Sequence, residues 1–289
     1  MGRASLGVKR VELPPFDKGY FPNKSFNDIP DGGSSDCRNV IWYRSGLRKM
    51  FGMDLVNAAQ AATLRGSGVF YLDVRGATAR TAVFGTGFYE DEAGVWTART
   101  GAVAITDGAN NLVQAINWQQ GANRYAIYVN GVNPPWRWTG AGAAVVLGGA
   151  PPNFSTIGKY HDTVFGSENE NLFFSPTGDP ETWPAANVIV YDKNITSQQD
   201  HGATLCVLME DHIGSLSGFD FLDFQQEESE IATVGCVGRL ASTKAHFGKN
   251  DTKVVATISR DGIYLVDEAY GYERILGEDF FSQFNQANI

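Results

Sequence analysis

The chain has 289 residues, of which 33 are glycine, 12% are aromatic and 19% are charged. Its formal net charge of −9 argues against a general nucleic-acid-binding surface, because such a surface needs clustered lysine and arginine. Abundant glycine together with many aromatic residues favours short strands joined by tight turns over helices. No apolar run approaches membrane-spanning length, so we expect no membrane insertion.

The cysteine pattern indicates neither a metal site nor a disulfide framework. Cys37, Cys206 and Cys236 are an odd number, lie far apart and include no C-x-x-C pair. The N-terminal residues lack the apolar core of a secretory signal. We therefore expect free thiols in a protein made in a reducing compartment.

Residues 1–27 mix three prolines with charges and isolated aromatic side chains, and no periodic element fits them. We interpret this segment as an extended N-terminal arm that lies over the body of the protein, residues 28–289, or over a neighbouring molecule. Phe16, Tyr20 and Phe21 are its candidate interface anchors. A disordered tail is the alternative, and the sequence does not separate the two.

The stretch 26–52 is typical of a β-hairpin preceded by turns. Pro30 fixes its own φ angle, and the glycines that follow supply the positive φ of tight turns. A strand-like run at 39–43, a reversal at 44–46 and a second run at 47–51 complete the hairpin. Arg38, Arg48 and Lys49 are candidate contacts with a neighbouring subunit. Local pairing with aspartates that cap the turns is the alternative.

The hairpin region contains, in this order, Asp28-Ile29-Pro30-Asp31-Gly32, Asp36, Arg38-Asn39-Val40, Gly46-Leu47-Arg48-Lys49 and Gly52. This series resembles the N-terminal signature of bacteriophage tail-nozzle proteins, the β-propeller proteins that stabilise packaged DNA in short-tailed phages. Phe51 departs from the family, which often has proline there. A later loop at 174–183, FS-x-x-GDP-x-x-W, also resembles a loop common in phage propellers.

Five strand–turn–strand units recur along the rest of the chain, with turns roughly 40 to 50 residues apart. They occupy 81–96, 124–138, 162–175, 203–216 and 253–266. This spacing is typical of propeller blades, four-stranded sheets whose faces are buried by radial stacking. We predict an all-β fold: a β-propeller of about five to seven four-stranded blades, closed partly by N-terminal strands. One or two β-sandwiches are the alternative.

Between residues 214 and 230 aromatic side chains alternate with acidic ones. Phe219, Phe221 and Phe224 are interleaved with Asp220 and Asp223, and an acidic run follows. Such a pattern predicts an exposed strand or extended loop with one apolar face. A docking edge for another subunit is the functional interpretation, and a solvated strand face is the alternative.

A search for catalytic motifs finds little. The four histidines have no metal-ligand spacing, and no nucleotide, protease or hydrolase motif occurs. The run 259–262, Ser-Arg-Asp-Gly, resembles half of the Asp-box of sialidase-type propellers, which is a structural turn. We expect no enzyme activity, cofactor or metal. A sialidase- or lyase-like enzyme acting on glycans, which needs clustered arginines with Tyr and Glu in one pocket, or a glycan-binding module, remains the alternative.

The tail-nozzle resemblance implies a structural virion protein made in the host cytoplasm. It implies a homo-oligomeric ring, commonly a hexamer, that joins portal and adaptor proteins to tail-fibre or tailspike proteins at the head-tail connection. Such a ring continues the channel that retains packaged DNA and lets it pass during ejection. An acidic surface favours passage of DNA without sequence-specific binding, since like charges repel. A propeller module of cellular origin, distinguished by staying monomeric, is a further alternative.

Overall fold

The computed structural model describes residues 66–73, 78–108, 111–120, 123–220, 222–228, 234–247, 252–267 and 269–276, with four short strands before them. The chain divides into two compact units, residues 1–55 and 56–289. The first unit holds the parallel pair β1 (Gly19–Tyr20) and β2 (Gly33–Ser34) and the antiparallel hairpin β3 (Val40–Tyr43) and β4 (Gly46–Lys49). The predicted hairpin is thus confirmed. That these N-terminal strands help to close the propeller stays a prediction.

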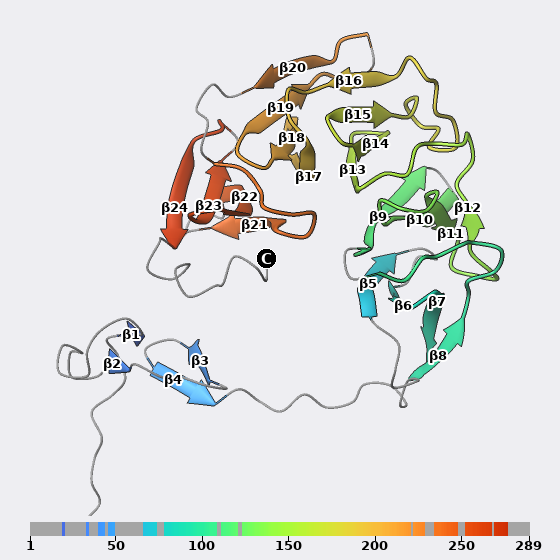
Figure 1. The fold of residues 1–289 in the computed structure, drawn as a ribbon, viewed down its shortest axis with the longest axis horizontal. Helices are drawn as coiled ribbons and strands as arrows, with labels where there is room; N and C mark the ends of the chain where they lie inside the picture. Colours follow the sequence, from blue (N-terminus) through green and yellow to red (C-terminus); the bar gives the residue numbers. More distant parts are fainter. Residues whose placement is uncertain are drawn as a thin grey trace, which may run out of the picture. The chain divides into compact units, whose positions relative to one another are not determined.

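The described residues of the second unit form five four-stranded antiparallel sheets, here called blades 1 to 5 (Figure 1). Blade 1 comprises β5 (Gly66–Asp73), β6 (Thr78–Phe84), β7 (Gly87–Glu92) and β8 (Val95–Ala98). Blade 2 comprises β9 (Gln114–Gln120), β10 (Asn123–Val129), β11 (Trp136–Trp138) and β12 (Val145–Val146). Blade 3 comprises β13 (Thr156–Tyr160), β14 (Thr163–Glu168), β15 (Asn171–Phe174) and β16 (Val188–Val190).

Blade 4 comprises β17 (Ile195–His201), β18 (Thr204–Met209), β19 (Ile213–Ser217) and β20 (Gln225–Glu228). Blade 5 comprises β21 (Ser242–Phe247), β22 (Thr252–Ser259), β23 (Gly262–Asp267) and β24 (Tyr272–Leu276). In every blade the strands pair in chain order, and the first strand lies innermost as the blades follow one another around a common centre (Figure 1). The described residues include no helix. The all-β propeller prediction is confirmed, and each of the five predicted units lies within one blade and includes its two middle strands.

The burial pattern along the strands follows from the stacking of the blades. In β14 and β18 side chains of both faces are buried, because neighbouring blades cover both faces of their sheets. In β5 buried and exposed residues alternate instead, and Val69 and Tyr71 are 54% and 68% exposed. Strand β5 therefore has one face against blade 2 and one face open.

Each junction between consecutive blades has its own apolar core. Phe88, Tyr128, Trp136 and Trp138 dominate the core between blades 1 and 2. Three further cores join blades 2 and 3, 3 and 4, and 4 and 5. No such core joins blade 5 to blade 1 within the residues that the structure describes.

The proline-rich loop after β15 fastens blade 3 to blade 2. Within the loop the Asp179 carboxylate accepts hydrogen bonds from the Glu181 N–H and the Thr182 hydroxyl at 3.1 and 2.7 Å. Glu181 in turn accepts a hydrogen bond from the Gly148 N–H at 2.6 Å and pairs with Arg137 of β11 at 2.5 Å. The loop at 174–183, which resembles a loop of phage propellers, thus connects blade 3 to blade 2 through hydrogen bonds and an ion pair.

Two of the three cysteines lie in the core between blades 4 and 5. Cys206 and Cys236 are buried and unpaired. Burial raises the pKa of Cys206 to about 12, so its thiol stays protonated at neutral pH. Low reactivity follows, since the thiolate is the nucleophile. Cys37 lies outside the described residues.

Candidate functional site

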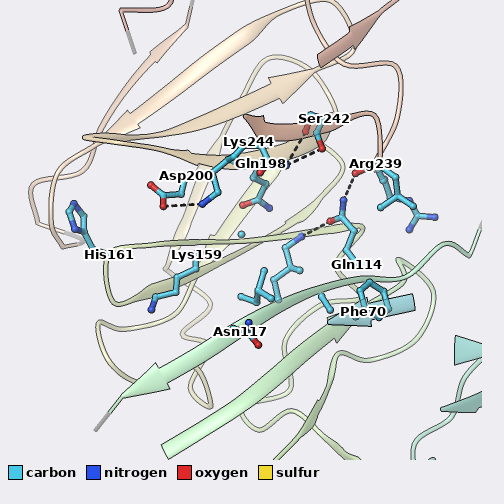
Figure 2. Close-up of a pocket in the computed structure, with 16 residues that line it drawn as sticks. Phe70, Gln114, Asn117, Lys159, His161, Gln198, Asp200, Arg239, Ser242 and Lys244 are labelled. Atoms are coloured by element: carbon cyan, nitrogen blue, oxygen red, sulfur yellow. Dashed lines mark hydrogen bonds and ion pairs between the residues drawn. The ribbon is translucent and has the colours of Figure 1, made fainter. Parts of the chain in front are cut away.

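The innermost strands of the five blades surround a central cavity of about 560 Å³ (Figure 2). Its wall includes Phe70 of β5, Asn117 of β9, Lys159 of β13, Gln198 of β17 and Lys244 of β21. Because successive residues of a strand point to opposite sides, only part of each inner strand reaches the cavity. A volume of this size lies within the range of about 300–1,000 Å³ that is usual for ligand pockets.

Glutamine side chains connect neighbouring inner strands across the wall of the cavity. The Gln114 amide oxygen accepts a hydrogen bond from the Ile157 N–H at 3.1 Å. Gln198 Nε2 donates to the Thr156 hydroxyl at 2.8 Å, and Gln199 Nε2 donates to the Ser242 hydroxyl at 3.1 Å. Gln114 and Gln199 each join their own strand to that of the following blade, and Gln198 joins its strand to that of the preceding blade. The amides therefore hold the inner strands in register and give the cavity a polar wall.

One end of the cavity is spanned by the segment that leads into blade 5. The Arg239 carbonyl accepts a hydrogen bond from Gln114 (Figure 2). The Arg239 guanidinium donates to the Asn130 carbonyl at 2.7 Å. A longer contact of 3.5 Å reaches the Ser155 carbonyl. Partial burial lowers the pKa of Arg239. Arg239 thus links the start of blade 5 to blades 2 and 3 across the centre.

Replacing Arg239 with alanine is expected to lower the free energy of unfolding by about 2 kcal/mol, because buried carbonyls lose a charged donor. Chemical denaturation measures the change. Arg260→Ala is the control, since the Arg260 guanidinium is exposed and pairs with Glu210 at the surface. Its removal is expected to change stability little. Equal stability of both variants would show that Arg239 does not hold the blades together.

The opposite end of the cavity carries charged side chains. Lys244 Nζ lies 3.3 Å from the Asp200 carboxylate, and Lys159 Nζ lies 5.0 Å from the centroid of the Trp118 ring. A second cavity of about 290 Å³ adjoins this end, shares Asp200 and Lys244 with the first, and includes Lys253. We call this end of the cavity, with the adjoining second cavity, the channel mouth.

A loop of blade 4 holds an aromatic ring at the channel mouth. Phe219 is 69% exposed, and its ring lies 4.7 Å from that of His161, which lines the cavity. The Asp223 carboxylate accepts hydrogen bonds from the N–H groups of Phe219 and Asp220, both at 2.8 Å. These two bonds hold the pKa of Asp223 below its usual value. We call residues 218–223 the Phe219 loop.

The structure locates only some of the predicted interface residues. Phe219 is exposed, whereas Phe224 is half-buried and packs between Phe165 and Phe174 at centroid distances of 5.5 and 5.3 Å. The other candidates lie outside the residues whose side chains are described: Phe16, Tyr20, Phe21, Arg38, Arg48, Lys49 and Phe221. Their roles stay predictions. The cavity residues Gln114, Lys159, Gln198 and Lys244 were not predicted.

The described residues that line the cavity lack the clustered arginines, tyrosine and glutamate that a sialidase-like site requires. Among the described residues that line it there is one arginine, Arg239, and no tyrosine or glutamate. The described residues include no group of three or more His, Cys, Asp or Glu side chains placed to hold a metal ion. Likewise, no helix long and apolar enough to cross a membrane occurs in the part of the chain that the structure describes.

Comparisons with known proteins show the fold alone. No family model and no curated protein matches the sequence. The extracellular domain of the putative hybrid two-component system BT4673 from B. thetaiotaomicron superposes with a TM-score of 0.51 at 9% identity, over 78% of this chain and 29% of that one. BBS1N from its complex with ARL6DN superposes with a TM-score of 0.50 at 9% identity, over 81% of this chain and 74% of that one.

Both neighbours are β-propeller proteins, so the second unit belongs to the propeller class by architecture as well as by strand order. A fold of this kind hosts many unrelated functions. The function of this chain must therefore be argued from its own residues.

Proposed function

We propose that the chain is a structural virion protein, a subunit of the tail-nozzle or head-to-tail connector ring of a short-tailed phage. One observation carries the proposal: the chain that bears the nozzle-like signature at residues 28–52 also contains a propeller unit, the fold that this resemblance implies. Neither feature alone suffices, since propellers serve many functions.

In this proposal the work of the subunit is mechanical and electrostatic. Identical subunits, commonly six, form a closed ring that joins portal and adaptor proteins to tail-fibre or tailspike proteins. Head-to-tail contacts that close on rotation are the usual way to build such a ring. The ring encloses the DNA path, and the net charge of −9 disfavours adhesion of phosphates to its wall.

The candidate contacts between subunits are the arm, residues 1–27, and the acidic-aromatic stretch 219–230, which begins in the Phe219 loop. Aromatic side chains are the usual anchors of interfaces, because they bury a large area at small cost in conformational entropy. Phe219 and Leu222 stand 69% and 80% exposed on a loop that its own hydrogen bonds hold in place. An ordered loop that displays two large apolar side chains fits a surface for another protein.

Assembly is the test of this proposal. The full chain is produced together with portal and adaptor proteins of a short-tailed phage, and the particles are imaged by electron cryo-microscopy. We expect closed rings of the chain below the portal. A chain that stays monomeric and never joins particles would contradict the proposal and favour a propeller module of another kind.

Two substitutions test the interface residues within that assembly. Phe21→Asp and Phe221→Asp are each expected to reduce incorporation of the chain into particles, since a charge in a desolvated contact is costly. Val95→Asp is the control, because Val95 is exposed on β8 and belongs to neither candidate segment. Normal incorporation of both phenylalanine variants would show that the contacts lie elsewhere.

A further inference from the structure

The Phe219 loop displays large apolar side chains and carboxylates side by side. Phe219 and Leu222 are 69% and 80% exposed, and Asp220 and Asp223 of the same loop are also exposed. The Asp220 carboxylate accepts a hydrogen bond from the Leu222 N–H at 2.8 Å, and the Asp223 carboxylate accepts two further N–H groups of the loop. These bonds order the loop before any partner binds, which lowers the entropy cost of binding.

The two aspartates give this surface a negative charge that the nearby lysines do not neutralise. Backbone hydrogen bonds hold the pKa of Asp223 below its usual value, so it is ionised at neutral pH. Within the described part of the chain, neither Asp220 nor Asp223 forms an ion pair with lysine or arginine. Lys244 is paired with Asp200 at 3.3 Å, and Lys159 lies against an aromatic ring of blade 2. The Phe219 loop is therefore an acidic surface with an apolar centre.

The arm, residues 1–27, has the opposite charge. It contains five lysine and arginine residues and two acidic residues, a net charge of +3, whereas residues 28–289 contain 18 and 30, a net charge of −12. Within the arm, Lys18 and Lys24 flank the aromatic pair Tyr20 and Phe21 in the run KGYFPNK. Two cations around two aromatic side chains thus complement two aspartates beside two large apolar side chains.

The apolar and the charged parts of this match have different roles. An exposed ion pair contributes little to affinity, because water and salt screen it. Burial of the aromatic pair of the arm against Phe219 and Leu222 would supply most of the binding free energy. The charges instead select the partner and its orientation, since like charges placed together are unfavourable. A nucleic acid, which is an anion, is disfavoured at this loop for the same reason.

We infer that the Phe219 loop of one copy binds residues 18–24 of the arm of a second copy. The two lysines of this run face the two aspartates of the loop, and its aromatic pair packs against Phe219 and Leu222. Because the contact joins different surfaces of the two copies, each copy offers one arm and one loop, and such contacts can close into a ring. The inference rests on the proposed function, since the ring is the assembly in which copies meet, and it makes the two candidate contacts each other's partners.

Self-association of the full chain is the first test. Sedimentation velocity measures it without any phage protein, in sodium chloride of about 0.1 M and about 1 M, where the screening lengths are about 10 and 3 Å. We expect a Kd on the order of 100 µM at the lower salt concentration. Association at the higher concentration is expected to be about tenfold weaker. A chain that stays monomeric up to about 1 mM, or whose association salt does not weaken, would overturn the inference.

Charge reversal locates the contact. Lys18→Asp combined with Lys24→Asp alters the arm, and Asp220→Lys alters the loop; each is expected to weaken self-association at least about tenfold. An equimolar mixture of the arm variant and the loop variant is expected to associate again, because one retains the native loop and the other the native arm. Lys193→Asp is the control, since Lys193 pairs with Asp211 at the opposite end of blade 4, and it should leave the Kd unchanged. Melting curves show that each variant is folded.

Cross-linking distinguishes the arm of a second copy from the arm of the same copy. A carbodiimide converts a lysine amine and a carboxylate in contact into an amide and takes up the water that is lost. In a mixture of ordinary and heavy-nitrogen-labelled full chain, mass spectrometry shows whether two linked peptides come from one copy or two. We expect links of mixed isotope composition between a lysine of the run 18–24 and an aspartate of the loop. Links of uniform composition alone, or links from the arm to other carboxylates alone, would overturn the inference.

The inference and the proposed function fail separately. Association through the arm and the loop in solution needs no phage protein, so it can occur in a chain that never joins particles. Conversely, closed rings below the portal that form normally from the Asp220→Lys variant, or from the arm variant, would reject this contact and leave the ring proposal standing.

Discussion

Replacing Gly235 with alanine is expected to lower the free energy of unfolding by about 3 kcal/mol, at the upper end of the usual cost of overpacking. A Cβ atom at this position would lie 2.4 Å from the Met209 carbonyl oxygen and 2.5 Å from that of Glu210. Both atoms belong to the backbone at the end of β18, which cannot move aside as a flexible side chain can. The Cys236 N–H also donates to the Met209 carbonyl at 2.7 Å, so relief of the clash breaks this bond.

Gly238→Ala in the same segment is the matched control. A Cβ at Gly238 has nothing within 4 Å, and neither glycine adopts a positive φ. The control is therefore expected to leave stability unchanged or to raise it by up to about 0.5 kcal/mol, because alanine lowers the conformational entropy of the unfolded chain. Thermal and chemical denaturation measure both variants. Similar stability of the two would show that the segment between blades 4 and 5 is loosely packed.

The sequence predicted the middle of every blade but not its inner edge. The five predicted units coincide with hairpins such as β18–β19, where Thr204–Met209 forms a nearly continuous apolar run. Such runs are visible in sequence because neighbouring blades bury both faces of these strands. The inner strands β9 and β17 read QAINWQQ and ITSQQDH, which lack that pattern.

The cavity was missed for the same physical reason. Residues that face the cavity are polar, so the inner strands show neither a continuous apolar run nor a clean alternation. The sequence nonetheless contained a pattern that could have indicated the cavity wall. Gln114, Gln198 and Gln199 lie in the strands β9 and β17, each of which directly precedes one of the predicted strand–turn–strand units. Only the radial arrangement brings these strands together, and no local pattern encodes it.

The acidic-aromatic stretch shows a different limit of sequence analysis. Its alternation predicted an exposed strand or extended loop with an apolar face, and Phe219 is indeed exposed. The structure has a tight loop instead of a continuous strand, because Gly218 adopts a φ of 110° and Asp223 accepts two backbone N–H groups. Such local side-chain bonds compete with strand pairing. The loop turns Phe224 inward between blades 3 and 4.

Replacing Trp138 with alanine is expected to cost about 4 kcal/mol of folding free energy, as for other fully buried large aromatics. Trp138 has no exposed surface, donates from Nε1 to the Gly142 carbonyl at 3.1 Å, and meets Phe88 of blade 1 edge-on at 5.8 Å. Trp96→Ala is the matched control, because Trp96 is half-buried and lies on the other side of blade 1 against Phe84. Its cost is expected to be about 1 kcal/mol.

The location of Trp138 also predicts which blades lose most of their stability in Trp138→Ala. Blade 1 ends the described series of blades, and the core containing Trp138 is its one junction with another blade among the described residues. Hydrogen exchange of Trp138→Ala should therefore accelerate first in β6 and β7, while β18 and β22 keep their protection, because local opening follows the weakest contacts. Uniform acceleration across all five blades would instead show that the propeller unfolds as one cooperative unit and that blade 1 is supported by more than this core.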